Sequence, residues 1–170
     1  MGKEPAQLVE RGGLRGALVR VAARGLHRLL RLRWLVTRPK TQGVSALPVT
    51  PEGRVVLVRH SYAPGWYMPG GGRKPAEDPR EAALRELREE IGMTAHGTVR
   101  DGGEYFHRPH SKRDTVAFFV VEDVVYSARL SMEIDAIGAF APDALPAPIS
   151  PAARRRIREW HEGLPPAPDW

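Results

Sequence analysis

Residues 71–93 read GGRKPAEDPREAALRELREEIGM, and this stretch carries the strongest structural signal in the chain. Asp78 is followed by Pro79 and then by Glu81, an order typical of a helix start. The Asp side chain accepts backbone N–H groups, Pro is tolerated in the first turn, and an acid three positions on completes a capping box. Gly92 supplies the usual C-terminal stop. The stretch therefore predicts a helix from Asp78 to Gly92.

This helix would present two different faces. At about 100° per residue, three carboxylates share an arc of about 100°; they are Glu86, Glu89 and Glu90. Three apolar side chains form a stripe on another side, which should bury against a sheet; they are Leu84, Leu87 and Ile91. The crowded carboxylates repel one another, and a bound divalent cation would reverse that repulsion.

Carboxylate oxygens without His or Cys favour a hard cation, Mg²⁺ or Mn²⁺, over zinc. Such a cation neutralises a diphosphate, orients it, and lowers the pKa of a bound water. The alternative is that the three acids form a solvated face with no ligand.

The spacing fits G-x5-E-x7-R-E-U-x-E-E-x-G-U, where U is aliphatic, and chance gives such a match in about one chain of this size in ten million. The matching residues are Gly71, Glu77, Arg85, Glu86, Leu87, Glu89, Glu90, Gly92 and Met93. The stretch therefore resembles the box of the Nudix hydrolase family, and a weaker likeness extends over residues 42–147.

The resemblance implies a three-layer α/β/α sandwich with a mixed sheet. It also implies Mg²⁺-dependent cleavage of a nucleoside diphosphate linked to another moiety. By the same resemblance, Glu86, Glu89 and Glu90 are the metal ligands and the Gly71 carbonyl is a further one, while Glu77 and Arg85 organise the loop and helix. The catalytic base comes either from the box, at Glu86 or Glu89, or from a later loop, where Glu133 is the candidate. An ordinary exposed loop acid is the alternative for Glu133.

Residues on either side of the box are candidates for substrate contact. Gly70, Gly71 and Gly72 would allow a phosphate to approach the backbone closely. Arg59 and Arg73 could contact phosphate, although surface salt bridges are the commoner role of such residues. Trp66 and Tyr67 could stack on a base, but packing in the core is the favoured interpretation.

The remaining elements follow from periodicity and turn residues. Strands are predicted at 44–49 and 54–59, joined as a hairpin through Pro51-Glu52-Gly53, and again at 97–106 and 115–121. Ser150-Pro151 should open a last helix that ends near Glu162. Its arginines, residues 154–156 and 158, should form a solvated face, with RNA contact as the minority interpretation.

The charge divides the chain into an arm and a body. The whole chain has a net charge of +6, but residues 1–40 hold ten basic side chains against two acidic ones, and residues 41–170 hold sixteen against eighteen. Leu14 to Leu32 read as an amphipathic helix, which either packs on its own domain or contacts an anionic membrane or RNA. We therefore expect an arm over 1–40, a Nudix domain over 41–163 and a frayed tail over 164–170.

The absence of Cys excludes a disulfide scaffold and thiol catalysis, and it fits a reducing cytoplasm. No apolar run approaches the roughly 20 residues that cross a bilayer. Two other functions are compatible with the sequence: that of a catalytically silent Nudix-fold binding module, and the removal of pyrophosphate from RNA 5′ ends. The sequence does not indicate the oligomeric state.

Overall fold

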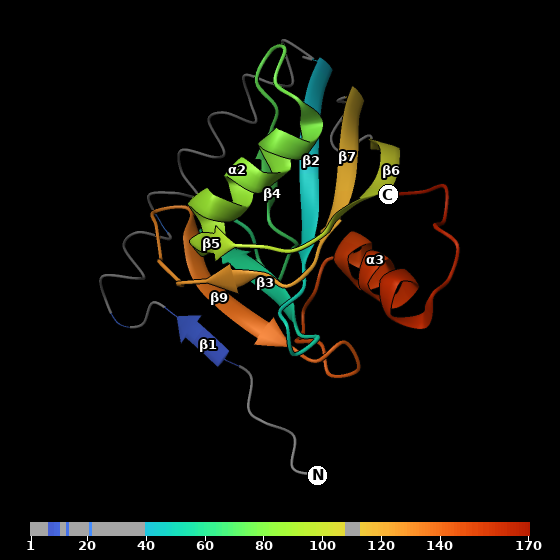
Figure 1. The fold of residues 1–170 in the computed structure, drawn as a ribbon. Coiled ribbons are helices and arrows are strands. Elements are labelled where there is room, and N and C mark those ends of the chain that lie inside the picture. Colours follow the sequence, from blue (N-terminus) through green and yellow to red (C-terminus); the bar gives the residue numbers. More distant parts are fainter. Residues whose placement is uncertain (1–6, 11–12, 14–20, 22–39, 108–112) are drawn as a thin grey trace.

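The computed structural model describes residues 7–10, 13, 21, 40–107 and 113–170 (Figure 1). The amphipathic helix predicted between Leu14 and Leu32 lies outside these residues, apart from Val21. None of the helices in the described part of the chain is long and apolar enough to cross a membrane.

The strands form a mixed sheet, an antiparallel sheet and a small ribbon. The mixed sheet has the order β4-β2-β7-β6 and comprises β4 (Gly70–Gly72), β2 (Lys40–Pro48), β7 (Arg113–Val121) and β6 (Val99–His107). Within it, β2 and β7 are parallel, while the other pairs are antiparallel. The antiparallel sheet has the order β1-β9-β3 and comprises β1 (Gln7–Glu10), β9 (Ile134–Phe140) and β3 (Val55–His60). The ribbon pairs β5 (Met93–Ala95) with β8 (Val125–Tyr126).

Two helices cover opposite faces of these sheets (Figure 1). Side chains alternate along each strand, so β3 sends Val56 and Val58 into the core beneath helix α2 (Pro79–Ile91). It sends Val55 and Leu57 into the core beneath helix α3 (Pro151–Glu162). The predicted three-layer α/β arrangement with a mixed sheet is therefore confirmed.

The two helices predicted within residues 41–163 are present, and each begins at its predicted N-terminal residue. The Asp78 carboxylate accepts hydrogen bonds from the backbone N–H groups of Arg80 and Glu81, at 2.9 and 3.2 Å. Gly92 ends α2 in the left-handed conformation, with φ 70°. Ser150 caps α3 through its hydroxyl oxygen, which accepts from the Ala153 N–H at 3.1 Å.

The hairpin predicted between residues 44–49 and 54–59 is wrong. The turn forms, and Val49 and Val55 make one antiparallel bridge, but the strands then diverge into different sheets. The reason is that both edges of β2 are occupied, by β4 on one side and β7 on the other. Strand β3 pairs with β9 instead.

The first residues of the predicted arm include a strand that the sequence did not suggest. β1 pairs antiparallel with β9, from Gln7 opposite Ala139 to Glu10 opposite Ala136. The Glu10 carboxylate accepts a hydrogen bond from Arg59 on β3. Part of the arm therefore extends the antiparallel sheet.

The predicted frayed tail is also wrong, because residues 167–170 pack against α3. Arg156, predicted to be solvated, is only 1% exposed. Its guanidinium donates to the Asp169 carbonyl at 2.6 Å, pairs with Glu159 at 3.0 Å, and stacks on the Tyr105 ring at 4.2 Å. Trp170 contacts Tyr105 and Phe118, with ring centroids 5.4 and 5.9 Å away. Arg156 thus holds the tail against the sheet.

This packing gives a stability prediction. Arg156→Ala should lower the free energy of unfolding by about 3 kcal/mol, because it leaves the buried Glu159 carboxylate without its cation and removes the tail's anchor. Arg158→Ala, on the exposed face of the same helix, should change it by less than about 0.5 kcal/mol. Urea denaturation of both variants measures the difference, and equal effects would contradict the anchoring role.

Candidate active site

The carboxylate of Glu90 is buried against the backbone of β4. Its Oε2 atom accepts a hydrogen bond from the Gly70 N–H at 3.0 Å. Burial raises the pKa of Glu90 to about 8, and the Glu86, Glu133 and Glu89 carboxylates act in the same direction, against the Gly70 hydrogen bond. An ionised Glu90 is therefore costly in this position unless a cation is near.

The carboxylate of Glu86 lies directly over Gly71. A Cβ atom on Gly71 would come within 2.6 Å of the Glu86 carboxylate, whereas one on Gly72 would meet nothing within 4 Å. A Cβ on Gly70 would lie 2.3 Å from the Val44 carbonyl oxygen. Glycine is thus required at 70, where the backbone of β2 is too close for a side chain, while a side chain at 71 would have to displace the Glu86 carboxylate.

Arg85 links the helix of the box to the loop that precedes it. Its Nε donates to Glu77 Oε1 at 2.8 Å, and its Nη1 donates to Glu86 Oε1 at 2.7 Å. Its Nη2 donates to the Gly72 carbonyl at 3.0 Å. Hydrogen bonds to Arg85 and to the Lys74 N–H lower the pKa of Glu77 to about 2. These contacts support the organising role predicted for Glu77 and Arg85.

Glu86, Glu89, Glu90 and Glu133 form the acidic cluster. Glu89 is more exposed than Glu86 and Glu90, with 59% of its side chain accessible, and it lies 3.4 Å from Arg85 Nη1. Among the described residues, no three His, Asp or Glu side chains already surround one metal position. The donor set nonetheless fits a hard cation, because Glu86 and Glu90 both bring carboxylate oxygens to the Gly70–Gly71 backbone. Arg85 would have to release Glu86 and Glu89 to such a cation.

Glu133 comes to the same site from the other sheet. The loop before β9 is held to the end of β3 by the Ser61 N–H, which donates to the Glu133 carbonyl at 2.8 Å. The Ser61 hydroxyl also donates to the Met132 carbonyl, at 2.7 Å. Glu133 is close enough to raise the pKa of Glu90. The structure therefore brings together Glu86, Glu90 and Glu133.

Tyr62 is a site residue that the sequence analysis missed. Burial raises its pKa to about 12, and Glu90, Glu133 and Glu86 add to that shift. Its ring stacks on His60, with centroids 5.0 Å apart. An aromatic residue just beyond a buried strand is too common a pattern to have indicated this position.

Two predicted phosphate contacts do not join the cluster. Arg59 lies over Trp66, 5.6 Å from the ring centroid, and pairs with Glu10 and with Asp135, the latter at 3.3 Å. This is the α3 side of β3, away from α2. Arg73 forms a side-chain hydrogen bond with Gln42, near the start of β2.

A cavity of about 260 Å³ adjoins Gly70 and Gly71. His60, Tyr67 and Trp170 contribute rings to its lining, and Ser150 and Ala152 bring it to the start of α3. Trp66 itself is buried, with its ring edge against Phe140, as predicted for a core residue. Tyr67 is half-buried and faces this cavity.

The fold and the box together define a diphosphate hydrolase of the Nudix class. The chain belongs to the Nudix family, since the NUDIX domain matches residues 39–161.

Proteins similar to this chain include two with named hydrolase activities and one with a solved structure. A Bacillus subtilis (strain 168) protein provisionally named 8-oxo-dGTP diphosphatase is 28% identical over 123 residues, 72% of this chain and 81% of that protein. The RNA pyrophosphohydrolase of Rhodospirillum rubrum is 44% identical over 55 residues, and the match spans only 32% of this chain and 33% of that enzyme. The crystal structure of a MutT protein from Methanosarcina mazei Go1 has a TM-score of 0.59 and 26% identity, over 74% of this chain and 94% of that one.

The glycine contacts predict a contrast between neighbouring positions. Gly71→Ala should displace the Glu86 carboxylate and reduce kcat/KM by about 100-fold, because small displacements of catalytic groups are costly. Gly72→Ala should stay within about threefold of the wild type, since its Cβ meets open space. Steady-state assays of both variants, with circular dichroism as a folding check, measure this, and similar rates for the two would be the contrary result.

The raised pKa of Glu90 predicts a pH-dependent stability. The folded protein retains a proton on Glu90 up to a pKa of about 8, while the unfolded chain releases it near 4.5. This contribution to stability is full below pH 4.5 and is lost as the pH rises through 8. In metal-free buffer, Glu90→Gln should therefore raise Tm relative to wild type by about 5 °C or more at pH 9, and by little at pH 5.

Glu89→Gln is the matched control for this measurement, because its side chain is exposed. Calorimetric scans at pH 5, 7 and 9 would follow both variants. A constant difference between Glu90→Gln and wild type across that range would mean that Glu90 is not destabilised by ionisation.

Proposed function

We propose that this protein hydrolyses the diphosphate linkage of a nucleoside diphosphate joined to another group, with Mg²⁺ or Mn²⁺ as its cofactor. The observation that supports this most is the convergence of Glu86 and Glu90 on the Gly70–Gly71 backbone, with Glu133 close by. Glu86, Glu89 and Glu90 would hold the cation, with the Gly71 carbonyl as a further ligand.

The cost of burying the acids supports a cation in this place. Burial raises the pKa of Glu86 as well as that of Glu90, although the Arg85 hydrogen bond opposes the shift at Glu86. A divalent cation would stabilise both ionised groups and compete with Arg85 for Glu86. When bound, it would neutralise phosphate charge and lower the pKa of the attacking water.

The chain's own residues would carry the remaining tasks. The absence of side chains at Gly70 and Gly71 lets Glu86 and Glu90 lie against this backbone, and the open space beside Gly72 leaves room for a phosphate next to the carboxylates. Glu133 would take the proton of the water that attacks phosphorus, and one P–O bond of the diphosphate would break. The products would be a nucleoside monophosphate and the phosphorylated remainder, and Arg85 would keep Glu77 and the loop in position.

The cavity beside the glycines fits the organic part of such a substrate. Its volume of about 260 Å³ and its rings from His60, Tyr67 and Trp170 suit a planar heterocycle. The name of the Bacillus subtilis relative points to a nucleotide, in agreement with this chemistry.

Removal of pyrophosphate from RNA 5′ ends is the second candidate. It is supported by the 44% identity to the Rhodospirillum rubrum RNA pyrophosphohydrolase, over 55 residues. The chemistry at the carboxylates would be the same, so a substrate comparison distinguishes the two: capped or triphosphate RNA against ADP-ribose, with Mg²⁺, scored by released phosphate or monophosphate.

Substitution of single acids tests the assignments. Glu90→Gln should bind Mg²⁺ poorly and lose most turnover while remaining folded. Glu133→Gln should keep its Mg²⁺ affinity and lose about 100-fold or more in kcat, as expected for a general base. The exposed Glu104→Gln is the control. Unchanged rates in Glu90→Gln would rule out the proposed metal site, and unchanged rates in Glu133→Gln would rule out that base.

A further inference from the structure

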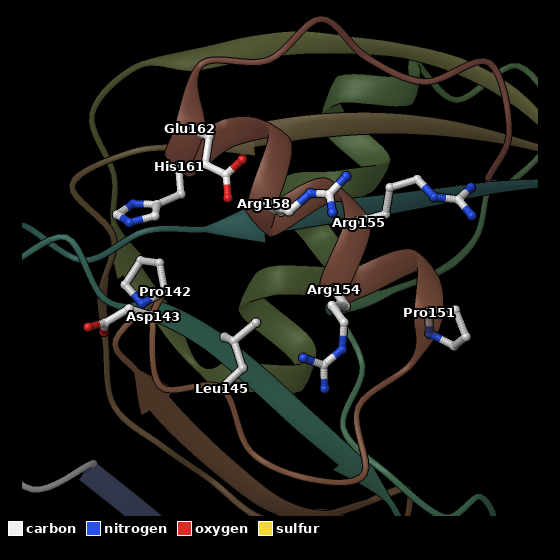
Figure 2. A pocket seen from close by; sticks show the side chains of 9 residues that line it. All are labelled: Pro142, Asp143, Leu145, Pro151, Arg154, Arg155, Arg158, His161 and Glu162. Carbon is white, nitrogen blue, oxygen red and sulfur yellow. The ribbon is translucent and has the colours of Figure 1, made fainter.

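A second hollow lies on the outer side of α3, away from the acidic cluster. It has a volume of about 740 Å³. Figure 2 shows Arg154, Arg155 and Arg158 along α3, with Pro142 and Leu145 contributed by the loop that precedes the helix. We refer to this hollow as the α3 groove.

The arginines of the α3 groove are available to a ligand. Arg154 and Arg158 are exposed, and neither makes a hydrogen bond or ion pair with any residue in the described part of the chain. They are four positions apart on one helix face, where like charges repel. Arg155 is fixed beside them, because its Nη1 donates to the carbonyls of Asp169 and Trp170 at 2.9 and 3.1 Å.

These positive charges are locally concentrated in a body that is otherwise slightly acidic. Residues 41–170 hold sixteen basic and eighteen acidic side chains, but three of those sixteen, Arg154, Arg155 and Arg158, line the α3 groove against two acids, Asp143 and Glu162. Guanidinium groups are well suited to phosphate, which they can bind with two parallel hydrogen bonds. An anion between Arg154 and Arg158 would also relieve their repulsion.

The rest of the lining indicates more than a bare anion. Pro142 and Leu145 give the loop side of the groove an apolar wall, and Asp143 and Glu162 provide acceptors for hydroxyl or amino groups. The volume is in the range of small-molecule sites, roughly 300–1,000 Å³. We propose that the α3 groove binds a nucleoside phosphate, with its phosphate on Arg154 and Arg158 and its nucleoside part against the apolar wall.

AMP is a suitable probe, and metal-free buffer separates the two sites, because without a divalent cation the acids on α2 and Glu133 offer a phosphate no positively charged partner. NMR titration of the full chain with AMP should shift the amide resonances of residues 151–162 in a saturable way. Arg154→Ala/Arg158→Ala should weaken AMP binding about tenfold or more. Arg80→Ala/Arg100→Ala removes the same charge from exposed positions elsewhere and should bind AMP like the wild type.

Adenosine should not bind, and inorganic phosphate should bind more weakly than AMP. The proposal fails if AMP does not saturate the wild type, or if Arg154→Ala/Arg158→Ala binds AMP as tightly as wild type. It also fails if inorganic phosphate binds as tightly as AMP. It fails likewise if Arg154→Ala/Arg158→Ala weakens the binding of an RNA oligonucleotide but not the binding of AMP. Hydrolase activity is not measured in this titration, so its result is independent of the proposed reaction.

Discussion

The burial of acidic side chains against the backbone of β4 is the constraint on which the site depends. Glu90 accepts the Gly70 N–H, and Glu86 occupies the space where a Gly71 side chain would be. Burial of the apolar stripe of α2 offsets the free-energy cost of burying these carboxylates, since Leu87 and Ile91 are fully buried in the core beneath the helix. When α2 packs with its apolar stripe toward the core, the carboxylates of Glu86 and Glu90 lie against Gly70 and Gly71.

The two sheets contribute different parts of the site. The mixed sheet positions β4 beside β2 and beneath α2, which brings Glu86 and Glu90 to the glycines. The antiparallel sheet positions Glu133, because Ser61 at the end of β3 holds the loop before β9 through two hydrogen bonds. The divergence of β2 and β3 after one bridge is therefore what allows acids from different parts of the chain to meet.

The elements that could be predicted are those with local signals. Caps at Asp78 and Gly92 defined α2, and the box spacing defined the acids on its face. The pairing of strands, the strand at Gln7–Glu10 and the buried position of Arg156 depend on contacts between distant residues, which periodicity does not report. Tyr62 was missed because an aromatic residue beyond a buried strand is a common pattern, while Glu133 was suggested only by the family pattern.

The most direct measurement is the number of protons released when Mg²⁺ binds to the full chain, obtained by calorimetry in buffers of different ionisation enthalpy. Because the metal-free Glu90 has a pKa of about 8, Mg²⁺ should displace about one proton at pH 7 and almost none at pH 9.5. Binding of Mg²⁺ at pH 7 without proton release, or no binding at all, would contradict the account of buried acids that need a cation.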